Sequence, residues 1–441
     1  MRASALIAFL ALGCCRLTAQ EISPYLFGQN HWLAQGDEGN RPGYLDLLWP
    51  QVKSSGVRMI RIGGNGYERR MPDSLRLSKM IDSIKSIDAE PLLQVPRQYT
   101  ADEAYRLVRF VNAPAREHVH YWSIGNEPIL SKDTIEHIYT YILRIAPAMK
   151  KADPSIKILV FDECDFYPDA YRALCGGRLD LTGKDDNGNW IIDGFTFHRY
   201  PNGAEYERSD VVFGGIQNIH NSAMQLADLI QSADKKHGRR GDARLVWGLT
   251  EVNVTYANPN REVSGTGNPS FLGGQFIAEA YGIGLKFGAF TVCPWCISET
   301  DHVSTDFGYL GLPSEFFPRS SYYHTQMMAL NFKGHYLPVT TNNGYVKAIG
   351  SQDRERICVM ILNETESGVL DFDLVLNARG KSARPLVVTA DAGIDEVITG
   401  RIPNQTTILF VFDGNGKKVK EYTYGVAQNL RDRPPEVRAF Q

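Results

Sequence analysis

The sequence predicts an α/β fold, a (β/α)8 TIM barrel followed by a small antiparallel β-sandwich. The first observation is that runs of β-branched and aromatic residues alternate with helical patterns up to residue 333. The second is that short strands follow one another beyond this point without helices between them. We therefore expect a signal segment at 1–19, the barrel at 20–333, the sandwich at 334–425 and a tail at 426–441.

Eight strands are expected in the barrel. Strands that alternate with helices form right-handed parallel βαβ units, and eight such units within about 310 residues are typical of a closed barrel. An open doubly wound sheet is the competing architecture, but it usually has a Gly-rich loop after its first strand, and the run FGQNHW is not one. The strand runs lie at 22–30, 57–65, 90–96, 119–127, 156–163, 192–200, 244–252 and 288–297.

Helical patterns fill most of the intervals between these strands. In the run TADEAYRLVRFVN, Thr100 and Glu103 are placed as a capping box, which marks the start of a helix. The expected helices lie at 73–89, 100–112, 132–153, 222–238 and 271–288, with a last one at 320–332 after the eighth strand.

The C-terminal part of the chain shows strand patterns only. A succession of short strands of this kind, over about 85 residues, is typical of a small antiparallel sandwich. The stretch AQNLRDRPPEVRAFQ at the end carries little apolar material, so we expect a loose tail there. The predicted sandwich strands lie at 344–351, 356–364, 370–377, 384–391 and 406–413.

The N-terminus has the pattern of an export signal. One Arg precedes an apolar run from Ala5 to Cys15, and small residues follow around Ala19, as in a secretory signal peptide. The run is too short to cross a membrane, which needs about 20 apolar residues. We expect a secreted or periplasmic protein with no membrane span; lipidation at Cys14, which would make it an outer-membrane lipoprotein, is the alternative.

Composition narrows the class of partner. The 441 residues carry a net charge of −3 with both signs interspersed, which gives no electrostatic reason to expect nucleic acid or an anionic membrane. The loop KDDNGNWIIDG has Trp190 where a calcium loop needs Gly, so a turn is favoured. Cys293 and Cys296 have the spacing of a redox dithiol but lie in an apolar run, which favours buried thiols. We expect no cofactor and no metal.

Polar side chains gather at the ends of the predicted barrel strands. The run YWSIGNEPIL begins as a strand and stops at Pro128, which leaves Glu127 at the strand's C-terminal tip. Active sites of (β/α)8 barrels are built at that end of the strands. The residues at the tips are Asn30, His31, Arg61, Asn65, Asn126, Glu127, Glu163, His198, Tyr200, Glu251, Asn253, Trp295 and Glu299.

Glu127 and Glu251 are the sharpest pair among them. Strands four and seven lie across the barrel mouth, so both carboxylates would point into one cavity. Two carboxylates that flank an acetal carry out glycoside hydrolysis, with retention at a separation of about 5–5.5 Å and inversion at about 6.5–9.5 Å. Glu163 and Glu299 are the rival carboxylates; Glu163 adjoins Asp162 and Asp165, which suggests a solvated loop.

The motifs on these strands resemble those of a known clan of enzymes. WSIGNEP at 122–128 resembles the acid/base motif of the clan A retaining glycoside hydrolases, and most closely that of the α-L-arabinofuranosidase, β-xylosidase and β-glucuronidase families (51, 39 and 79). RIGGN at 61–65 looks like the turn that ends strand two in those families, and HRY at 198–200 is similar to their His-x-Tyr on strand six. The resemblance covers the barrel and the sandwich.

The resemblance implies roles for these residues. Glu127 would be the acid/base and Glu251 the nucleophile, with Asn126 donating to the sugar 2-hydroxyl. Arg61 would hold the charge of the nucleophile, while His198 and Tyr200 would orient it. The run WGLTEVNV around Glu251 has little of the family context, so the nucleophile assignment follows from strand order.

Further expectations concern the residues around the pair. We expect the charge of Glu251 to raise the pKa of Glu127, and donors from Arg61 and Tyr200 to lower that of Glu251. Trp295 would present its ring to a sugar or fill the core, and Asn30 and His31 would contact hydroxyl groups. A glycan on the sequon at Asn253 would conflict with the site.

The predicted function is a metal-independent retaining O-glycoside hydrolase. It would act on poly- or oligosaccharides by double displacement through Glu127 and Glu251. The alternative is a non-catalytic carbohydrate-binding protein on the same barrel.

Overall fold

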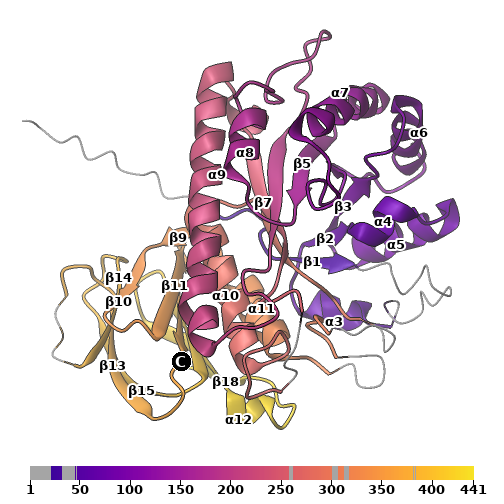
Figure 1. Cartoon of the computed structure of the whole chain (residues 1–441). Coiled ribbons are helices and arrows are strands. Elements are labelled where there is room, and N and C mark those ends of the chain that lie inside the picture. The colour runs from indigo at the N-terminus through magenta and orange to yellow at the C-terminus, as the bar shows by residue number, and fades with distance from the viewer. Residues whose placement is uncertain are drawn as a thin grey trace, which may run out of the picture.

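The computed structural model describes residues 21–31, 45, 47–257, 262–299, 306–311, 317–380, 382 and 384–441. The predicted signal segment, with Cys14, lies outside them. Eight parallel strands form one sheet in sequence order, as predicted (Figure 1). They are β1 Gly28–His31, β2 Met59–Ile62, β3 Glu90–Val95, β4 Tyr121–Ile124, β5 Lys157–Glu163, β6 Gly194–Arg199, β7 Val246–Val252 and β8 Thr291–Pro294.

The sheet closes on itself between its first and last strands. Phe27 forms a parallel bridge with Val292, whose N–H donates to the carbonyl of Leu26 at 2.8 Å. A layer of apolar side chains fills the barrel below the strand tips, from Met59, Leu92, Leu159, Phe290 and Cys293. This layer leaves the C-terminal ends of the strands as the place for a polar site.

Helices surround the barrel where the sequence predicts them. α6 starts with the predicted capping box between Thr100 and Glu103, and α10 ends at Gly288 in the left-handed conformation. The short helices α3, α4 and α8 were not predicted. The helices are α3 Trp49–Ser54, α4 Asn65–Arg69, α5 Ser74–Ser86, α6 Ala101–Val111, α7 Ile135–Ala152, α8 Pro168–Leu174, α9 Ile216–His237, α10 Phe271–Phe287 and α11 Ser320–Asn331, with helical turns η1 Asp210–Gly215 and η2 Gly241–Ala243.

Two sheets form the C-terminal sandwich, which confirms the predicted fold class. Among the strands that the structure describes here, all pairs are antiparallel except β13 with β14. The first sheet has the order β18-β17-β16-β12-β11-β9 and the second β10-β14-β13-β15. The strands are β9 His335–Leu337, β10 Val339–Thr341, β11 Val346–Gln352, β12 Arg356–Asn363, β13 Val369–Val375, β14 Leu386–Ala390, β15 Val397–Pro403, β16 Thr406–Asp413, β17 Lys418–Gly425 and β18 Glu436–Ala439.

The expectation of a loose tail at 426–441 was wrong. Helix α12, Val426–Asn429, follows β17 directly, and β18 pairs with β17 from Lys420↔Ala439 to Thr423↔Glu436. The side chains of β18 are all exposed. Backbone pairing at the sheet edge, rather than burial, orders this segment, which is why an apolar pattern did not reveal it.

The sandwich lies beside the barrel, against α10 and α11 (Figure 1). Gly282 on α10 lies so close to Ile349 on β11 that a Cβ there would come within 2.9 Å of it. His324 on α11 reaches the hydroxyl of Thr407 at 2.7 Å. Among the described helices, none is long and apolar enough to cross a membrane. Cys293 and Cys296 are buried free thiols.

Candidate active site

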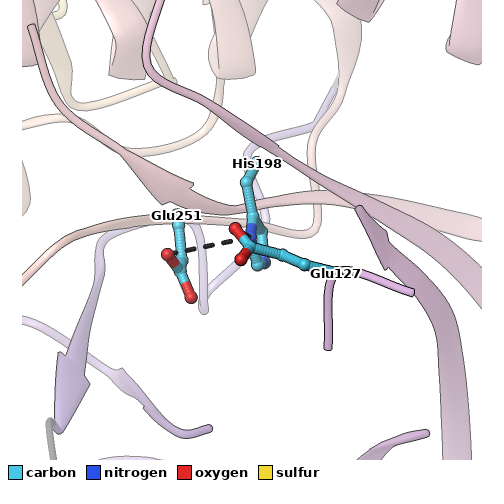
Figure 2. Close-up of side chains that lie close together, drawn as sticks. All are labelled: Glu127, His198 and Glu251. Atoms are coloured by element: carbon cyan, nitrogen blue, oxygen red, sulfur yellow. Dashed lines mark hydrogen bonds and ion pairs between the residues drawn. The ribbon is translucent and has the colours of Figure 1, made fainter. Parts of the chain in front are cut away.

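Charged side chains from four strands, and from the segment that follows β4, converge at the C-terminal end of the barrel. Arg61, Asp162 and His198 are fully buried, and Glu127 and Glu251 are 7% and 6% exposed. Figure 2 shows the Glu127 carboxylate beside the His198 imidazole, with the Glu251 carboxylate facing them. The predicted pair therefore meets in one place.

A β-bulge places Glu251 in the site. Between β6 and β7 the register runs from Phe197↔Leu249 to His198↔Glu251, so Thr250 is an extra residue. A bulge of this kind turns two consecutive side chains to the same face of the sheet. The Thr250 hydroxyl accordingly donates to Asp162, while Glu251 accepts from Arg61 at 2.7 Å.

A second irregularity, in β5, places Asp162. The register between β5 and β6 shifts between Val160 and Glu163, and Phe161 has φ +66°. Asp162 then reaches Arg61 Nη2 at 3.1 Å. The sequence-based view of Asp162 and Glu163 as part of a solvated loop was wrong, because both side chains are fully buried. Asp165, in contrast, is 43% exposed and pairs with Arg199.

The chain leaves β4 through two residues with positive φ. These are Gly125 at +77° and Glu127 at +44°, the latter being uncommon for a residue with a side chain. The Glu127 N–H donates to the Asp162 carbonyl at 2.7 Å. The Glu163 carboxylate accepts the N–H of Ile129 at 2.7 Å, so this rival carboxylate anchors the loop after Glu127.

Each carboxylate of the pair accepts two hydrogen bonds. Glu127 accepts from His198 Nδ1 at 3.1 Å and from the Asn65 amide at 2.9 Å. Glu251 accepts from Arg61 Nη1 at 2.7 Å and from the Tyr200 hydroxyl at 2.9 Å. Ligand atoms of Glu127, His198 and Glu251 lie within 4.8 Å of one another.

Two carboxylates and an imidazole can also serve as ligands of a divalent cation. Here the protein itself supplies a hydrogen-bond donor to each of the four carboxylate oxygens, and the imidazole nitrogen faces one of them. The guanidinium of Arg61 adds a positive charge against Glu251. The arrangement is therefore suited to holding protons.

The expected directions of the two carboxyl pKa values were wrong. Burial raises the pKa of Glu127, but the hydrogen bond and charge of His198 and the Asn65 amide bring it below its usual value. Burial raises the pKa of Glu251 by more than the charges of His198 and Arg61 lower it. The reason is that His198 hydrogen-bonds to Glu127 and lies 3.7 Å from Glu251.

His198 lies among three carboxylates. Burial lowers its pKa, but Glu251, Asp162 and Glu127 together raise it to about 10. Burial likewise raises the pKa of Asp162, while Arg61 and His198 lower it well below its usual range. At neutral pH the site thus contains an imidazolium ion that sequence reasoning did not anticipate.

The other predicted site residues differ in how they contact the charged side chains. Asn126 accepts from Arg61 Nη2 at 2.6 Å and donates to Asn65. Asn30 accepts from Arg61 and donates to the carbonyls of Thr250, Cys293 and Pro294, so its role is to join strands. His31 stacks on Trp49, and burial lowers its pKa to about 4.

Trp295 borders the site through Gly64. A Cβ on Gly64 would lie 2.8 Å from the Trp295 ring and 3.9 Å from a Glu251 oxygen. Asn253 is 3% exposed and donates to the Trp295 carbonyl at 2.7 Å, so its sequon lies within the protein in the folded state. Glu299, the other rival, accepts the N–H of Phe307 at 2.8 Å.

Solved structures share this architecture over most of their length. A family 51 arabinofuranosidase from Xanthomonas axonopodis pv. citri aligns with a TM-score of 0.63 at 12% identity, over 89% of this chain and 97% of that chain. An α-L-arabinofuranosidase from Thermotoga maritima, in complex with arabinose, gives 0.61 at 14% identity, over 92% and 95%. A Paenibacillus polymyxa xyloglucanase of family 44 gives 0.59 at 11% identity, over 89% and 96%.

No family model matches the chain, and no curated protein matches its sequence. At these identities the likeness establishes the fold. The resemblance that the strand-end motifs indicated is confirmed at that level, because the structural neighbours include family 51 enzymes.

Proposed function

We propose that this chain is a retaining glycoside hydrolase in which Glu127 is the acid/base and Glu251 the nucleophile. The observation that carries the proposal is the approach of the two carboxylates, whose ligand oxygens lie within 4.8 Å of each other. An approach this close suits direct attack by one carboxylate on the anomeric carbon, whereas the wider separation in inverting enzymes leaves room for a water molecule.

The donors around Glu251 fit the role of a nucleophile. Arg61 and Tyr200 hold its two oxygens in place, so the carboxylate is oriented before a substrate binds. When Glu251 attacks the anomeric carbon and the glycosidic bond breaks, its charge is lost in the ester. Water then attacks the ester with Glu127 as the base, which restores the carboxylate.

The surroundings of Glu127 fit the role of an acid that changes its protonation state during the reaction. In the free site the Asn65 amide donates to Glu127 Oε2, and Asn65 is the solvent-exposed member of the two donors. A glycosidic oxygen is an acceptor, so when it replaces the Asn65 amide it requires a proton on Glu127. Substrate binding thereby favours the protonated carboxyl that bond cleavage needs.

The substrate class follows from the fold and the neighbours. The neighbours are described as arabinofuranosidases, a β-xylosidase and xyloglucanases, and we propose a plant or microbial polysaccharide or its oligosaccharides as the substrate. The apolar N-terminal run supports export, with the mature protein secreted or periplasmic.

A panel of nitrophenyl glycosides and polysaccharides tests the proposal. We expect hydrolysis by the purified protein, with the anomeric configuration of the first product retained in proton NMR spectra. Glu251→Ala and Glu127→Ala should each abolish turnover of unactivated substrates. A protein that binds these sugars but hydrolyses none of them would be the non-catalytic alternative, and an inverted first product would contradict double displacement.

A further inference from the structure

Asp162 is a third buried carboxylate in the site, and the proposed reaction gives it no role. The charged side chains of the site form a cluster of Arg61, Glu127, Asp162, His198 and Glu251. The Asp162 oxygens face both cations of this cluster, at 3.1 Å from Arg61 Nη2 and 3.6 Å from His198 Nε2. The second distance is that of an ion pair rather than a hydrogen bond. The Thr250 hydroxyl also donates to it, so the position of Asp162 is fixed by contacts with β2, β6 and β7.

The positions of the atoms favour a positive charge on His198. Its Nδ1 lies 3.1 Å from a Glu127 oxygen, and its Nε2 lies 3.6 Å from an Asp162 oxygen. A neutral imidazole would turn a lone pair toward one of these oxygens unless that oxygen itself carried the proton. A proton is therefore held between His198 and its carboxylate partners.

The charges of the cluster do not balance. Glu127, Glu251 and Asp162 contribute three negative charges when ionised, and Arg61 and His198 contribute two positive ones. An uncompensated charge in a buried site is costly, and uptake of a proton is the usual way in which a protein removes it. One proton on the glutamate pair makes the cluster neutral.

We propose that Asp162 is a positioning residue that makes the glutamate pair hold one proton, which Glu127 receives when the substrate binds. The proposal rests on the proposed function. Without Asp162, two cations would balance two ionised glutamates, and nothing would draw a proton to Glu127.

The same balance serves both halves of the reaction. Before cleavage, when a substrate oxygen has replaced the Asn65 amide, a protonated Glu127 and an ionised Glu251 give a neutral cluster. After cleavage, the ester removes the charge of Glu251 and Glu127 is ionised, so the cluster is neutral again. The proton passes from Glu127 to the leaving oxygen, and the next water molecule returns one to Glu127 as its oxygen bonds to the anomeric carbon.

Other titratable groups border the cluster. Glu163 lies outside the count because the backbone N–H groups of Ile129 and Cys164 donate to its carboxylate. Burial raises the pKa of Tyr200 well above 10 and that of the Cys293 thiol to about 12, so both are neutral. Cys164 is neutral for the same reason, with a pKa raised to about 12. The groups facing the cluster include Arg61 on β2, Glu163 on β5 with Cys164 and Tyr167 beyond it, His198 on β6 with Tyr200 just beyond it, Glu251 on β7, and Cys293 on β8 with Cys296 beyond it. Burial also raises the pKa values of Tyr167 and Cys296, so both are neutral.

The test compares Asp162→Asn with the wild type on substrates with different leaving groups. We expect the alkaline limb of the kcat/KM profile to move down by at least about one pH unit, because the variant no longer favours a proton on the glutamate pair. At pH values above that limb, activity on an alkyl glycoside should fall at least tenfold. A dinitrophenyl glycoside, whose leaving group needs no proton, should lose much less activity than the alkyl glycoside.

His198→Asn gives the opposite sign and keeps the test decisive if Asp162→Asn folds poorly. Removing a cation makes the cluster more negative, so the alkaline limb should move to higher pH. Asp193→Asn is the matched control, because Asp193 is another buried carboxylate and forms an ion pair with Lys150 at 2.6 Å. It should lower stability and leave the pH profile in place.

The outcomes separate the two proposals. If the wild type hydrolyses glycosides but the alkaline limb stays fixed in Asp162→Asn, or moves in the same direction in both variants, the role of Asp162 is wrong and the hydrolase proposal stands. If the wild type hydrolyses no glycoside at all, the proposed function itself fails.

Discussion

Arg61 connects most of the side chains in the site. Its two terminal nitrogens donate to Asn30, Glu251, Asn126 and Asp162, and the side chain is fully buried. A guanidinium can make this set of bonds because its N–H groups lie in one rigid plane. Two of the four partners are carboxylates, so Arg61 is also the main compensation for buried negative charge.

Replacing Arg61 by Met should therefore cost stability as well as activity. The variant keeps much of the apolar stem and leaves Asp162 and Glu251 without their cation, and breaking a buried pair in this way costs about 3–5 kcal/mol. Urea unfolding followed by circular dichroism measures the loss. Arg106→Met is the control, since Arg106 pairs with Asp102 on the surface and should cost about 1 kcal/mol or less. Equal losses would contradict this account of Arg61.

Tyr200 offers a test of the charge on Glu251. Tyr200→Phe removes one hydroxyl that donates to Glu251 at 2.9 Å and leaves the ring in place. Loss of a single donor to a reacting oxygen typically lowers kcat by about 10²–10³. We expect a fall in kcat of that size with little change in KM in steady-state assays. Tyr345→Phe, on the exposed side of the sandwich, should change neither, and a change in KM alone for Tyr200→Phe would argue against the assignment.

The sequence was sufficient to identify most residues of the site but not their charges. Glu127, Glu251 and Arg61 could be predicted because they lie at strand tips, and the barrel brings tips together. Asp162 could not, because strand alternation does not show a bulge, and the bulge turns Asp162 inward. The pKa directions of the glutamates failed for a related reason: they depend on which carboxylate His198 contacts, and strand order does not contain that information.

At the scale of elements, the turn from β2 into α4 is the most constrained part of the site. Gly64 has φ +109° and ψ 178°, a conformation in which residues with a side chain are strained. Its N–H donates to Gln94 at 2.7 Å, so the turn is tied to β3. The close approach of the Trp295 ring adds a second reason why the residue has to be Gly.

Gly64→Ala should be more destabilising than the backbone alone requires. Gly188→Ala is the matched control, because Gly188 also has positive φ, at +82°, and a Cβ there meets nothing within 4 Å. The control measures the strain of positive φ without a steric contact, about 1–2 kcal/mol. Gly64→Ala should cost about 1–3 kcal/mol more, through its contact with Trp295 and through the φ/ψ region of Gly64, which residues with a side chain rarely adopt. Urea unfolding of both variants gives the difference, and equal losses would contradict both causes.

Elements of the barrel were easier to predict than those of the sandwich. Long periodic runs mark α5, α7 and α10, whereas α4 and α8 are too short to show a period. In the sandwich, β15 and β18 lie at sheet edges, and exposed side chains predominate in β15 and make up all of β18. Such strands are held by backbone pairing, for which the side-chain pattern gives no sign.

At the scale of the whole molecule, a pair of buried carboxyl groups lies where the barrel meets the sandwich. Glu279 is on α10 and Glu364 follows β12, at 9% and 1% exposure. Burial, more than any charge, raises the pKa of Glu279 to about 7, and burial together with Glu279 raises the pKa of Glu364 well above its usual value. Lys347 and Arg208 face the pair. The two groups thus share protons at mildly acidic pH.

The junction should lose stability as the pH rises. Between the usual carboxyl pKa of 4.5 and about 7, the folded chain keeps a proton on Glu279 that the unfolded chain has released. Stability therefore falls across this window, by about 1.4 kcal/mol for each unit of the shift. Glu279→Gln cannot ionise, so it should match the wild type at pH 4.5 and be more stable by a few kcal/mol at pH 8.

The difference in unfolding free energy between Glu279→Gln and the wild type separates the effect of this pair from that of other titrating groups, such as His198. All six Trp residues precede the sandwich, so Trp fluorescence follows the barrel while far-ultraviolet circular dichroism follows both parts. Urea unfolding at pH 4.5, 6 and 8 with both probes should show a gap between variant and wild type that widens with pH. Because the pair joins the two parts, the gap should appear in both signals. A gap that stays constant with pH would mean that Glu279 is ionised throughout and that the junction is not held by a shared proton.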